Sequence, residues 1–291
     1  MLLESWFTEP KLPLGRLVKV GITWLQTNAA GFFDAVTAAI DFLVDGFTAI
    51  LTHVPFLVVV LAVAALGYWL HRSWRLAAFV VVAFVVIANL GYWQATLETI
   101  SLVGFSTLVS VVIGVPLGIA AAHRPWLYAL MRPLLDLMQT LPTFVYLIPT
   151  LVLFGLGVVP ALISTVVFAL PAPVRLTQLG ICGVPRSLLE AGEAFGATRW
   201  QLLCKVELPS AAPLIFAGIT QCIMLSLSMV VIAALVGAGG LGVPVVRALN
   251  TVQVGMGLEA GFVIVLLAII MDRITRALSG PQRPGMGGPP G

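Results

Sequence analysis

Seven long apolar segments restrict what this sequence can fold into more than any other feature. They cover residues 55–70, 76–93, 98–122, 141–157, 160–176, 211–236 and 258–274. A helix needs about 20 apolar residues to cross a bilayer, and inside a bilayer only helices or closed barrels satisfy all of their backbone hydrogen bonds. Charged residues make up only 9% of the chain, against about 25% in soluble domains. The sequence therefore predicts an all-α membrane protein with about seven spanning helices, and it excludes an ordinary soluble domain.

An amphipathic helix is expected before the first of these segments. Between residues 32 and 51, apolar side chains recur at helical spacing on one face, and the other face carries Asp34, Asp41 and Asp45. Three aspartates disfavour a spanning helix, so we expect this helix to lie in the membrane interface. Its polar face has no Lys or Arg, which favours the outer surface over the anionic cytoplasmic leaflet. A helix that simply packs on the bundle is an equally open interpretation.

The Lys and Arg residues are distributed unevenly around the apolar segments. If the N-terminus is outside, Arg247 alone falls in an outer loop between spans. The cytoplasmic segments then hold Arg72, Arg75, Arg124, Arg132, Arg175, Arg186, Arg199, Lys205, Arg273, Arg276 and Arg283. Because cytoplasmic loops are enriched in Lys and Arg, we expect a multi-pass protein with its N-terminus outside and its C-terminus in the cytoplasm.

A polar segment runs from Pro185 to Pro209 between two apolar ones. Local rules divide it into two short helices. Pro185 suits a first helical position, and Gly196 suits the left-handed residue that ends a helix. Thr198 and Gln201 have the spacing of a capping box that opens the second helix, which we expect to end at Pro209. A helical hairpin of this kind, held in the cytoplasm between two spans, is suited to contact a soluble partner.

The same segment resembles the EAA loop of ABC importer permeases. The residues that carry the pattern, with its spacing intact, are Glu190, Ala191, Gly192, Gly196, Val206, Leu208 and Pro209. The one departure is Gly192, where the family usually has Ala, and we expect it to loosen the first helix of the hairpin.

The flanking segments resemble permeases for glycine betaine, proline and choline, and the choline-uptake branch is the most similar. Residues 136–182 and 221–250 carry most of this likeness, which extends over about 90–277. It implies the type I ABC importer transmembrane fold in a bacterial inner membrane. The likeness gives a permease core at 94–277. Hydropathy and charge add an extracytoplasmic segment at 1–54 and two accessory spans at 55–93, and the Gly/Pro-rich composition predicts a disordered tail at 278–291.

The resemblance also implies the partners. In the family, the EAA loop is the coupling element that docks on the ATPase, so coupling is assigned to Glu190, Ala191, Gly192, Gly196, Ala197, Leu208 and Pro209. Two ATPase subunits, an extracytoplasmic solute-binding protein, a homodimer of the permease and a surrounding lipid bilayer follow from it. The implied function is import of choline, glycine betaine or proline-type osmolytes.

The residues themselves exclude an ATPase site. A P-loop requires Lys followed by Ser or Thr, and Lys11, Lys19 and Lys205 are followed by Leu, Val and Val. We therefore expect no cofactor on this chain and ATP use by a separate subunit. The net charge of +3 gives no reason to expect a nucleic acid as a partner. The three cysteines have no metal-binding spacing, so no metal site is expected either.

Five residues are candidates for the translocation pathway. Aromatic rings attract quaternary ammonium groups, and small polar side chains suit a pathway that does not bind its solute tightly. The candidates are Phe144, Tyr146, Gln221, Ser226 and Ser228. For the aromatic pair, core packing or lipid contact is the simpler interpretation, and the hydroxyl groups serve as readily for helix packing.

A stand-alone secondary carrier or channel for organic cations is the alternative function. Such carriers usually have ionisable residues within their spans. Here Glu98, Glu259 and Asp272 fall near the predicted span ends. The large cytoplasmic hairpin is also unexplained in a carrier, so the sequence favours the importer subunit.

Overall fold

The computed structural model describes residues 14–278, all of its regular elements being helical. The helices are α2 Leu14–Asn28, α3 Ala30–His53, α4 Phe56–His71, α5 Trp74–Asn89, α6 Trp93–His123, α7 Pro125–Thr140, α8 Thr143–Phe154, α9 Val158–Ala169, α10 Pro171–Cys182, α11 Arg186–Ala194, α12 Arg199–Leu202, α13 Leu208–Ala233, α14 Gly242–Thr251 and α15 Val254–Leu278. A π-helical segment, Leu203–Glu207, joins α12 to α13. The expected disordered tail lies outside the described residues, apart from residue 278.

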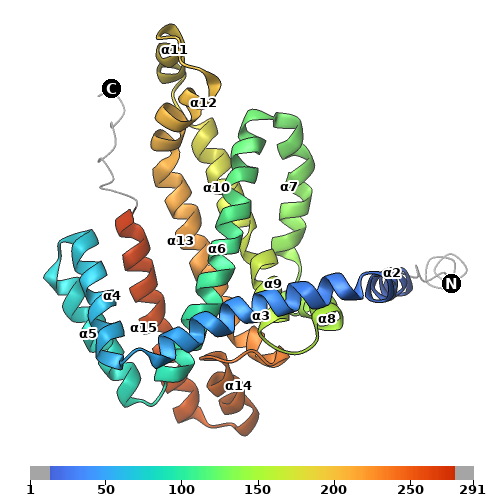
Figure 1. Cartoon of the computed structure of the whole chain (residues 1–291), viewed down its shortest axis with the longest axis vertical. Coiled ribbons are helices and arrows are strands. Elements are labelled where there is room, and N and C mark those ends of the chain that lie inside the picture. Colours follow the sequence, from blue (N-terminus) through green and yellow to red (C-terminus); the bar gives the residue numbers. More distant parts are fainter. Residues whose placement is uncertain (1–13, 279–291) are drawn as a thin grey trace, which may run out of the picture.

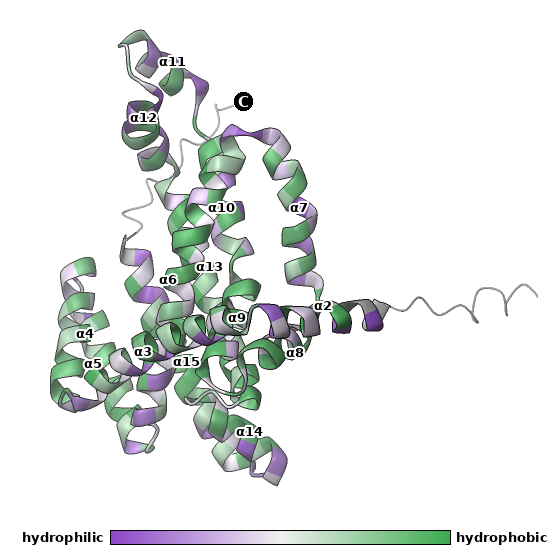
Figure 2. Ribbon diagram, turned by 45° about the vertical axis from the view of Figure 1, so that its right-hand side comes forward, coloured by the Kyte–Doolittle hydropathy of each residue, from purple (hydrophilic) through white to green (hydrophobic). Residues whose placement is uncertain are grey.

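Most of these helices run along one axis and form a bundle (Figure 1). The α11–α12 hairpin projects from one end of it, and α14 lies at the other (Figure 1). Apolar residues cover most of the length of the bundle helices, whereas the hairpin carries a mixture of polar and apolar residues (Figure 2). The expected all-α membrane fold is thereby confirmed.

Small residues let α6, α10 and α13 approach closely at the centre of the bundle. Gly114 and Gly118 are four residues apart on α6. A Cβ atom on Gly118 would lie 2.6 Å from the carbonyl oxygen of Val174 on α10, and one on Gly114 would lie 2.9 Å from Pro173 Cγ. A GxxxG spacing of this kind allows backbones to pack directly against one another. This spacing is visible in the sequence, but hydropathy alone does not indicate it.

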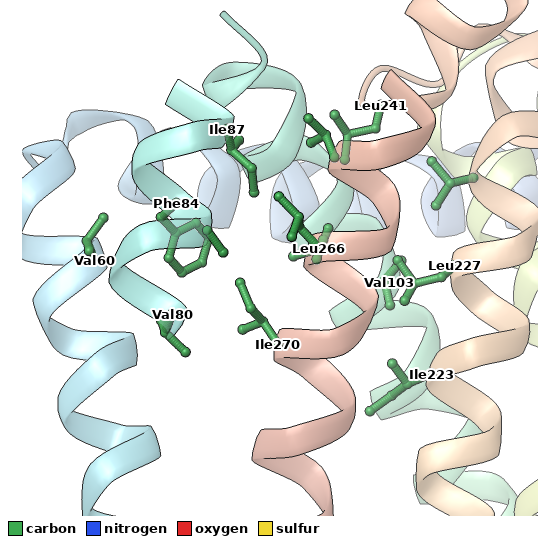
Figure 3. Packing of buried hydrophobic residues seen from close by; sticks show 14 of the residues in the cluster. Val60, Val80, Phe84, Ile87, Val103, Ile223, Leu227, Leu241, Leu266 and Ile270 are labelled. Atoms are coloured by element: carbon green, nitrogen blue, oxygen red, sulfur yellow. The ribbon is translucent and has the colours of Figure 1, made fainter. Parts of the chain in front are cut away.

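The accessory helices α4 and α5 join the rest of the bundle through an apolar cluster. Val60 of α4 and Phe84 of α5 lie beside Ile270 of α15, and the cluster continues to Val103 of α6 and Leu227 of α13 (Figure 3). These side chains are almost completely buried. Because lipid tails are as apolar as these residues, the contact is stabilised mainly by close packing.

The amphipathic helix expected at 32–51 is present as α3. It runs crosswise over the bundle near the end opposite the hairpin (Figure 1). Phe33 and Phe47 make edge-to-face contacts with Phe154 and Phe105, while most of the helix stays exposed. By length and composition alone α3 would be a candidate span. Its crosswise path agrees with the expected interfacial helix, and its contacts agree equally with packing on the bundle.

The fourth span predicted at 141–157 is wrong. The apolar helix there, α8, has only 12 residues, and it meets α7 at a bend of 97°. It is α7 that runs along the bundle in the corresponding place (Figure 1). Hydropathy underrates α7 because Arg132 and Asp136 lie on it, and Asp136 forms an ion pair with Arg175 of α10.

The other spans differ from their predictions in length. Helices α6 and α15 correspond to the third and seventh, whereas the fifth extends over Val158–Cys182 and the sixth begins as early as Arg199. Within residues 14–278, five helices including α3 are long and apolar enough to cross a membrane, and the bent α7–α8 pair would be a sixth. The first two predicted spans, α4 and α5, are apolar but only 16 residues each.

Candidate functional site

The hairpin expected between residues 185 and 209 is present and projects beyond the bundle (Figure 1). Its first helix, α11, begins at Arg186, so Pro185 occupies the N-cap and not the first helical position. None of the residues in α11 or α12 is buried, and a turn at Gly196 joins the two helices. The predicted coupling residues Glu190, Ala191 and Gly196 are therefore all on a surface that a partner can reach.

The turn between the two helices is a Schellman motif. Gly196 has φ = 75°, the left-handed conformation expected for it. The Gly196 N–H donates to the carbonyl of Glu193 at 2.8 Å, and the Ala197 N–H donates to the carbonyl of Gly192 at 3.1 Å. These two bonds satisfy carbonyl groups that the end of α11 would otherwise leave free. The expected glycine turn is thus confirmed in its geometry.

The second helix opens with the predicted capping box. The Gln201 N–H donates to the Thr198 hydroxyl at 3.3 Å, and the Thr198 N–H donates to the Gln201 side-chain oxygen at 2.9 Å. The Thr198 hydroxyl thereby satisfies the backbone N–H of Gln201, and the Gln201 side chain satisfies the backbone N–H of Thr198. The start of this helix is fixed by residues three positions apart, and for that reason sequence alone could place it.

The expectation that Pro209 ends this helix is wrong. Residues Arg199–Val236 form a continuous helical segment, and Pro209 lies in the first turn of α13. Pro209 has no N–H, and its ring crowds the carbonyl group of Lys205 four residues earlier. The chain adopts a π-helical conformation at Leu203–Glu207, which relieves this clash without ending the helix. Motion of the hairpin can therefore pass directly into the spanning helix α13.

Gly192 lies where α11 packs on the segment that follows it, and the expected loosening of α11 stays a prediction. A Cβ atom there would lie 2.6 Å from Leu202 Cδ1 and 3.7 Å from Val206 Cγ2. The missing side chain of Gly192 lets α11 pack closely on the segment that carries Leu202 and Val206. An Ala at this position would require Leu202 to change its rotamer.

A contact between a histidine and a carboxylate connects the base of the hairpin to α6. Glu207 Oε2 lies 2.9 Å from His123 Nε2, and the Glu207 side chain is nearly buried. The Nδ1 atom of His123 lies 2.9 Å from the carbonyl oxygen of Ile119. Both ring nitrogens of His123 therefore lie close to an oxygen atom, one on the hairpin side and one on its own helix. Residues 84 positions apart form this contact, and no local pattern could have indicated it.

Two aromatic residues of the hairpin are absent from the predicted site. Phe195 is 93% exposed and Trp200 is 72% exposed, and they flank the Gly196 turn. Large aromatic residues are enriched at the centres of protein interfaces, where their burial contributes most. The signal was available in the sequence, because these are the two aromatic residues of a segment that carries six charged ones.

The five candidate pathway residues do not share one surface. Phe144, Gln221 and Ser228 are exposed in the protomer, whereas Tyr146 and Ser226 are buried. The Tyr146 hydroxyl donates to the carbonyl of Met138 and so links α8 to the end of α7 across their bend. Its position indicates a structural role.

The two candidate serines on α13 also make contacts that suit a structural role. The Ser228 hydroxyl donates to the Met224 carbonyl of its own helix at 2.9 Å. The buried Ser226 lies near Cys222, which the hydroxyl groups of Thr107 and Ser110 on α6 approach. These small side chains fill the contact between α6 and α13. Phe144, Gln221 and Ser228 are thus the three candidates with exposed side chains, and their place in a pathway stays a prediction.

Residues 114–281 match a known protein family, described as the binding-protein-dependent transport system inner membrane component. The chain belongs to this family. It is 44% identical to the glycine betaine transport system permease protein OpuAB of Bacillus subtilis, over 92% of this chain and 94% of that protein. It is 41% identical to the glycine betaine/proline betaine permease ProW of Escherichia coli, over 95% of this chain and 78% of that protein.

A third relative and a solved structure agree with this assignment. The glycine betaine/carnitine transport permease GbuB of Listeria monocytogenes is 43% identical, over 93% of this chain and 96% of that protein. The MetNI methionine ABC transporter, solved in inward-facing conformations, matches with 28% identity and a TM-score of 0.55, over 62% of this chain and 93% of that chain.

This family membership gives the chain its place in a transporter. It is the multi-pass inner-membrane permease component of an ABC importer, and it works with an ATPase and a substrate-binding protein. Hydrolysis of ATP belongs to the separate ATPase subunit. The type I importer fold expected from the resemblance is confirmed by the match to MetNI.

Proposed function

We propose that this permease imports glycine betaine and related small solutes with a methylated quaternary nitrogen. The relatives OpuAB, ProW and GbuB are named for glycine betaine, proline betaine and carnitine. These solutes share a quaternary nitrogen and a carboxylate, so they carry no net charge. Choline, which the sequence resemblance favoured, lacks the carboxylate, and none of these three names includes it. We therefore place glycine betaine before choline as the substrate.

We further propose that the α11–α12 hairpin is the surface on which the ATPase docks. The observation that carries this proposal is the exposure of Phe195 and Trp200 on a hairpin that projects beyond the bundle. The backbone of the hairpin is fixed by the Gly196 turn and the capping box. A rigid surface with two exposed aromatic anchors suits a stable interface.

In this proposal two copies of the permease form the pathway, and one ATPase subunit docks on each. ATP binding draws the ATPases together and moves the hairpins, and the continuous segment Arg199–Val236 carries that motion into the membrane. The pathway then faces outward, where the binding protein delivers the solute. Hydrolysis returns the pathway to the inward-facing state.

The proposed orientation places the hairpin in the cytoplasm and the N-terminus outside. The Arg residues at the α4–α5 turn and at the end of α6 lie toward the same side as the hairpin, whereas Arg247 lies on α14 at the opposite end (Figure 1). This distribution supports the orientation through the enrichment of Lys and Arg on the cytoplasmic side.

Uptake by reconstituted proteoliposomes tests the substrate and the coupling together. The vesicles contain the permease, its ATPase and its binding protein, with or without internal ATP, and they receive labelled glycine betaine, carnitine or choline. We expect ATP-dependent accumulation of glycine betaine, reduced at least tenfold for choline, and no accumulation when the ATPase is omitted.

Two outcomes would contradict the proposal. Accumulation of glycine betaine by the permease alone, driven by an ion gradient, would establish the alternative of a secondary carrier. Preferred accumulation of choline with the complete transporter would overturn the proposed substrate and leave the coupling intact.

A further inference from the structure

A basic groove lies where α4 turns into α5 beside the end of α15. Its volume is about 370 Å³, and its lining residues are His71, Ser73, Arg75, Leu76, Phe79, Ile269 and Arg273. Two elements far apart in the sequence form it, because His71 and Arg273 are 202 residues apart. The His71 Nε2 atom lies 2.5 Å from the carbonyl oxygen of Arg273, and this contact holds the two sides of the groove together.

The polar side of the groove is positively charged. Within residues 14–278, no carboxylate forms an ion pair with Arg75 or Arg273, although Arg276 on the same helix pairs with Asp272 at 2.8 Å. The N-cap residue Ser73 makes no side-chain hydrogen bond to the first turn of α5. The free N–H groups of that turn add to the positive potential of the two guanidinium groups.

The apolar side of the groove and its surroundings match the edge of a bilayer. Leu76, Phe79 and Ile269 form this side. Trp69 and Trp74, which are 75% and 70% exposed, lie on the flanking helices. Exposed tryptophans concentrate where lipid headgroups meet the hydrocarbon core. A ligand of this groove therefore has an anionic part for the arginines and an apolar part that can remain in the lipid.

We propose that this groove binds the headgroup of an anionic phospholipid. The phosphate lies between Arg75 and Arg273, and the acyl chains extend along the apolar residues toward the bilayer. Guanidinium groups suit this role because they donate two parallel hydrogen bonds to a phosphate. The bound lipid connects the accessory helices α4 and α5 to α15 of the permease core. This assignment is independent of the solute that the transporter carries.

Native mass spectrometry of the purified full-length chain tests the site. The probes are phosphatidylglycerol and phosphatidylcholine with identical acyl chains, each added to delipidated protein. We expect phosphatidylglycerol to bind on the order of tenfold better than phosphatidylcholine, because each basic residue near a headgroup adds a favourable contribution. The double variant Arg75→Gln/Arg273→Gln should lose this preference. The control Arg276→Gln, one turn away and outside the groove, should keep it.

Two further variants keep the test decisive if the double variant does not fold. Ser73→Asp introduces a good N-cap residue but places a negative charge in the groove, so it should fold and lose the preference. Arg75→Lys/Arg273→Lys retains the charge and should keep most of it. An unchanged preference in Ser73→Asp, or equal loss in Arg276→Gln, would overturn the proposal. Full displacement of phosphatidylglycerol by millimolar inorganic phosphate would identify a free anion as the ligand and overturn the lipid assignment.

Discussion

Gly196 adopts a backbone conformation that other residues adopt only at a cost. Its φ of 75° lies in the left-handed region, where a non-glycine residue loses about 1–2 kcal/mol. Apart from Gly196 itself and its two chain neighbours, no atom lies within 4 Å of the position that a Cβ atom would take. The requirement for glycine therefore comes from the backbone alone and not from crowding.

A graded series at Gly196 tests whether the shape of this turn matters for coupling. Asn tolerates the left-handed conformation best, Ala less well, and the β-branched Val least. We expect ATP-driven uptake to fall in the order Gly196, Gly196→Asn, Gly196→Ala and Gly196→Val, with normal amounts of protein in the membrane. Uptake assays with quantified expression measure this order.

The control for this series is Gly46→Ala on α3. Gly46 also has open space at its Cβ position, and it lies within a helix where Ala is favourable. We expect uptake by Gly46→Ala to equal that of the unchanged protein. Uptake by Gly196→Val equal to that of Gly196→Asn would refute the need for a left-handed residue at the turn.

Local interactions explain which parts of the hairpin could be predicted. The turn at Gly196 and the capping box of Thr198 and Gln201 are each complete within six residues, so sequence spacing determines them. The continuation past Pro209 depends on a shift to π-helical hydrogen bonding, which spacing rules do not describe. The exposure of Phe195 depends on the position of the whole hairpin beyond the bundle, which is also not a local property.

At the scale of elements, α7 shows why hydropathy misplaced a span. Asp136 and Arg132 lower the apparent hydropathy of α7, but Asp136 is paired with Arg175 on another helix. Conversely, α8 is apolar and short, and its Thr150 hydroxyl lies 2.7 Å from that of Ser164 on α9. Hydropathy averaged over consecutive residues takes account of neither contact, because Arg175 and Ser164 lie on other helices. Hydropathy therefore established the helical membrane fold but not which of two neighbouring helices lies along the bundle.

The contact between α6 and α10 gives a second prediction. In Gly118→Ala the new Cβ atom would lie 2.6 Å from the Val174 carbonyl oxygen and 2.7 Å from Thr177 Cβ. The helices must separate, at a cost of about 1–3 kcal/mol. We expect a lower apparent melting temperature in detergent. Gly104→Ala on the same helix, where no atom of another helix lies within 4 Å of the new Cβ position, should leave that temperature unchanged or slightly higher. Equal melting temperatures for both variants would contradict the close packing.

At the scale of the whole molecule, the chain's own cysteines report which end faces the cytoplasm. The sequence has three: Cys204 is exposed at the base of the hairpin, Cys182 is exposed at the end of α10, and Cys222 is buried. With Cys182→Ser, Cys204 is the single accessible thiol. It lies on the side of the molecule opposite α14, so its labelling distinguishes the two orientations.

A membrane-impermeant maleimide applied to this variant should label inside-out vesicles and leave intact cells unlabelled, because the proposed orientation has the hairpin in the cytoplasm. The matched control lacks all three native cysteines and carries Asn250→Cys on the exposed surface of α14. It should show the reverse result, with labelling in cells whose outer layers admit the reagent. Labelling of Cys204 in intact cells would invert the proposed orientation and remove the hairpin from reach of a cytoplasmic ATPase. If the orientation holds, adding the ATPase to the vesicles should also slow labelling of Cys204, because docking on the hairpin covers its base.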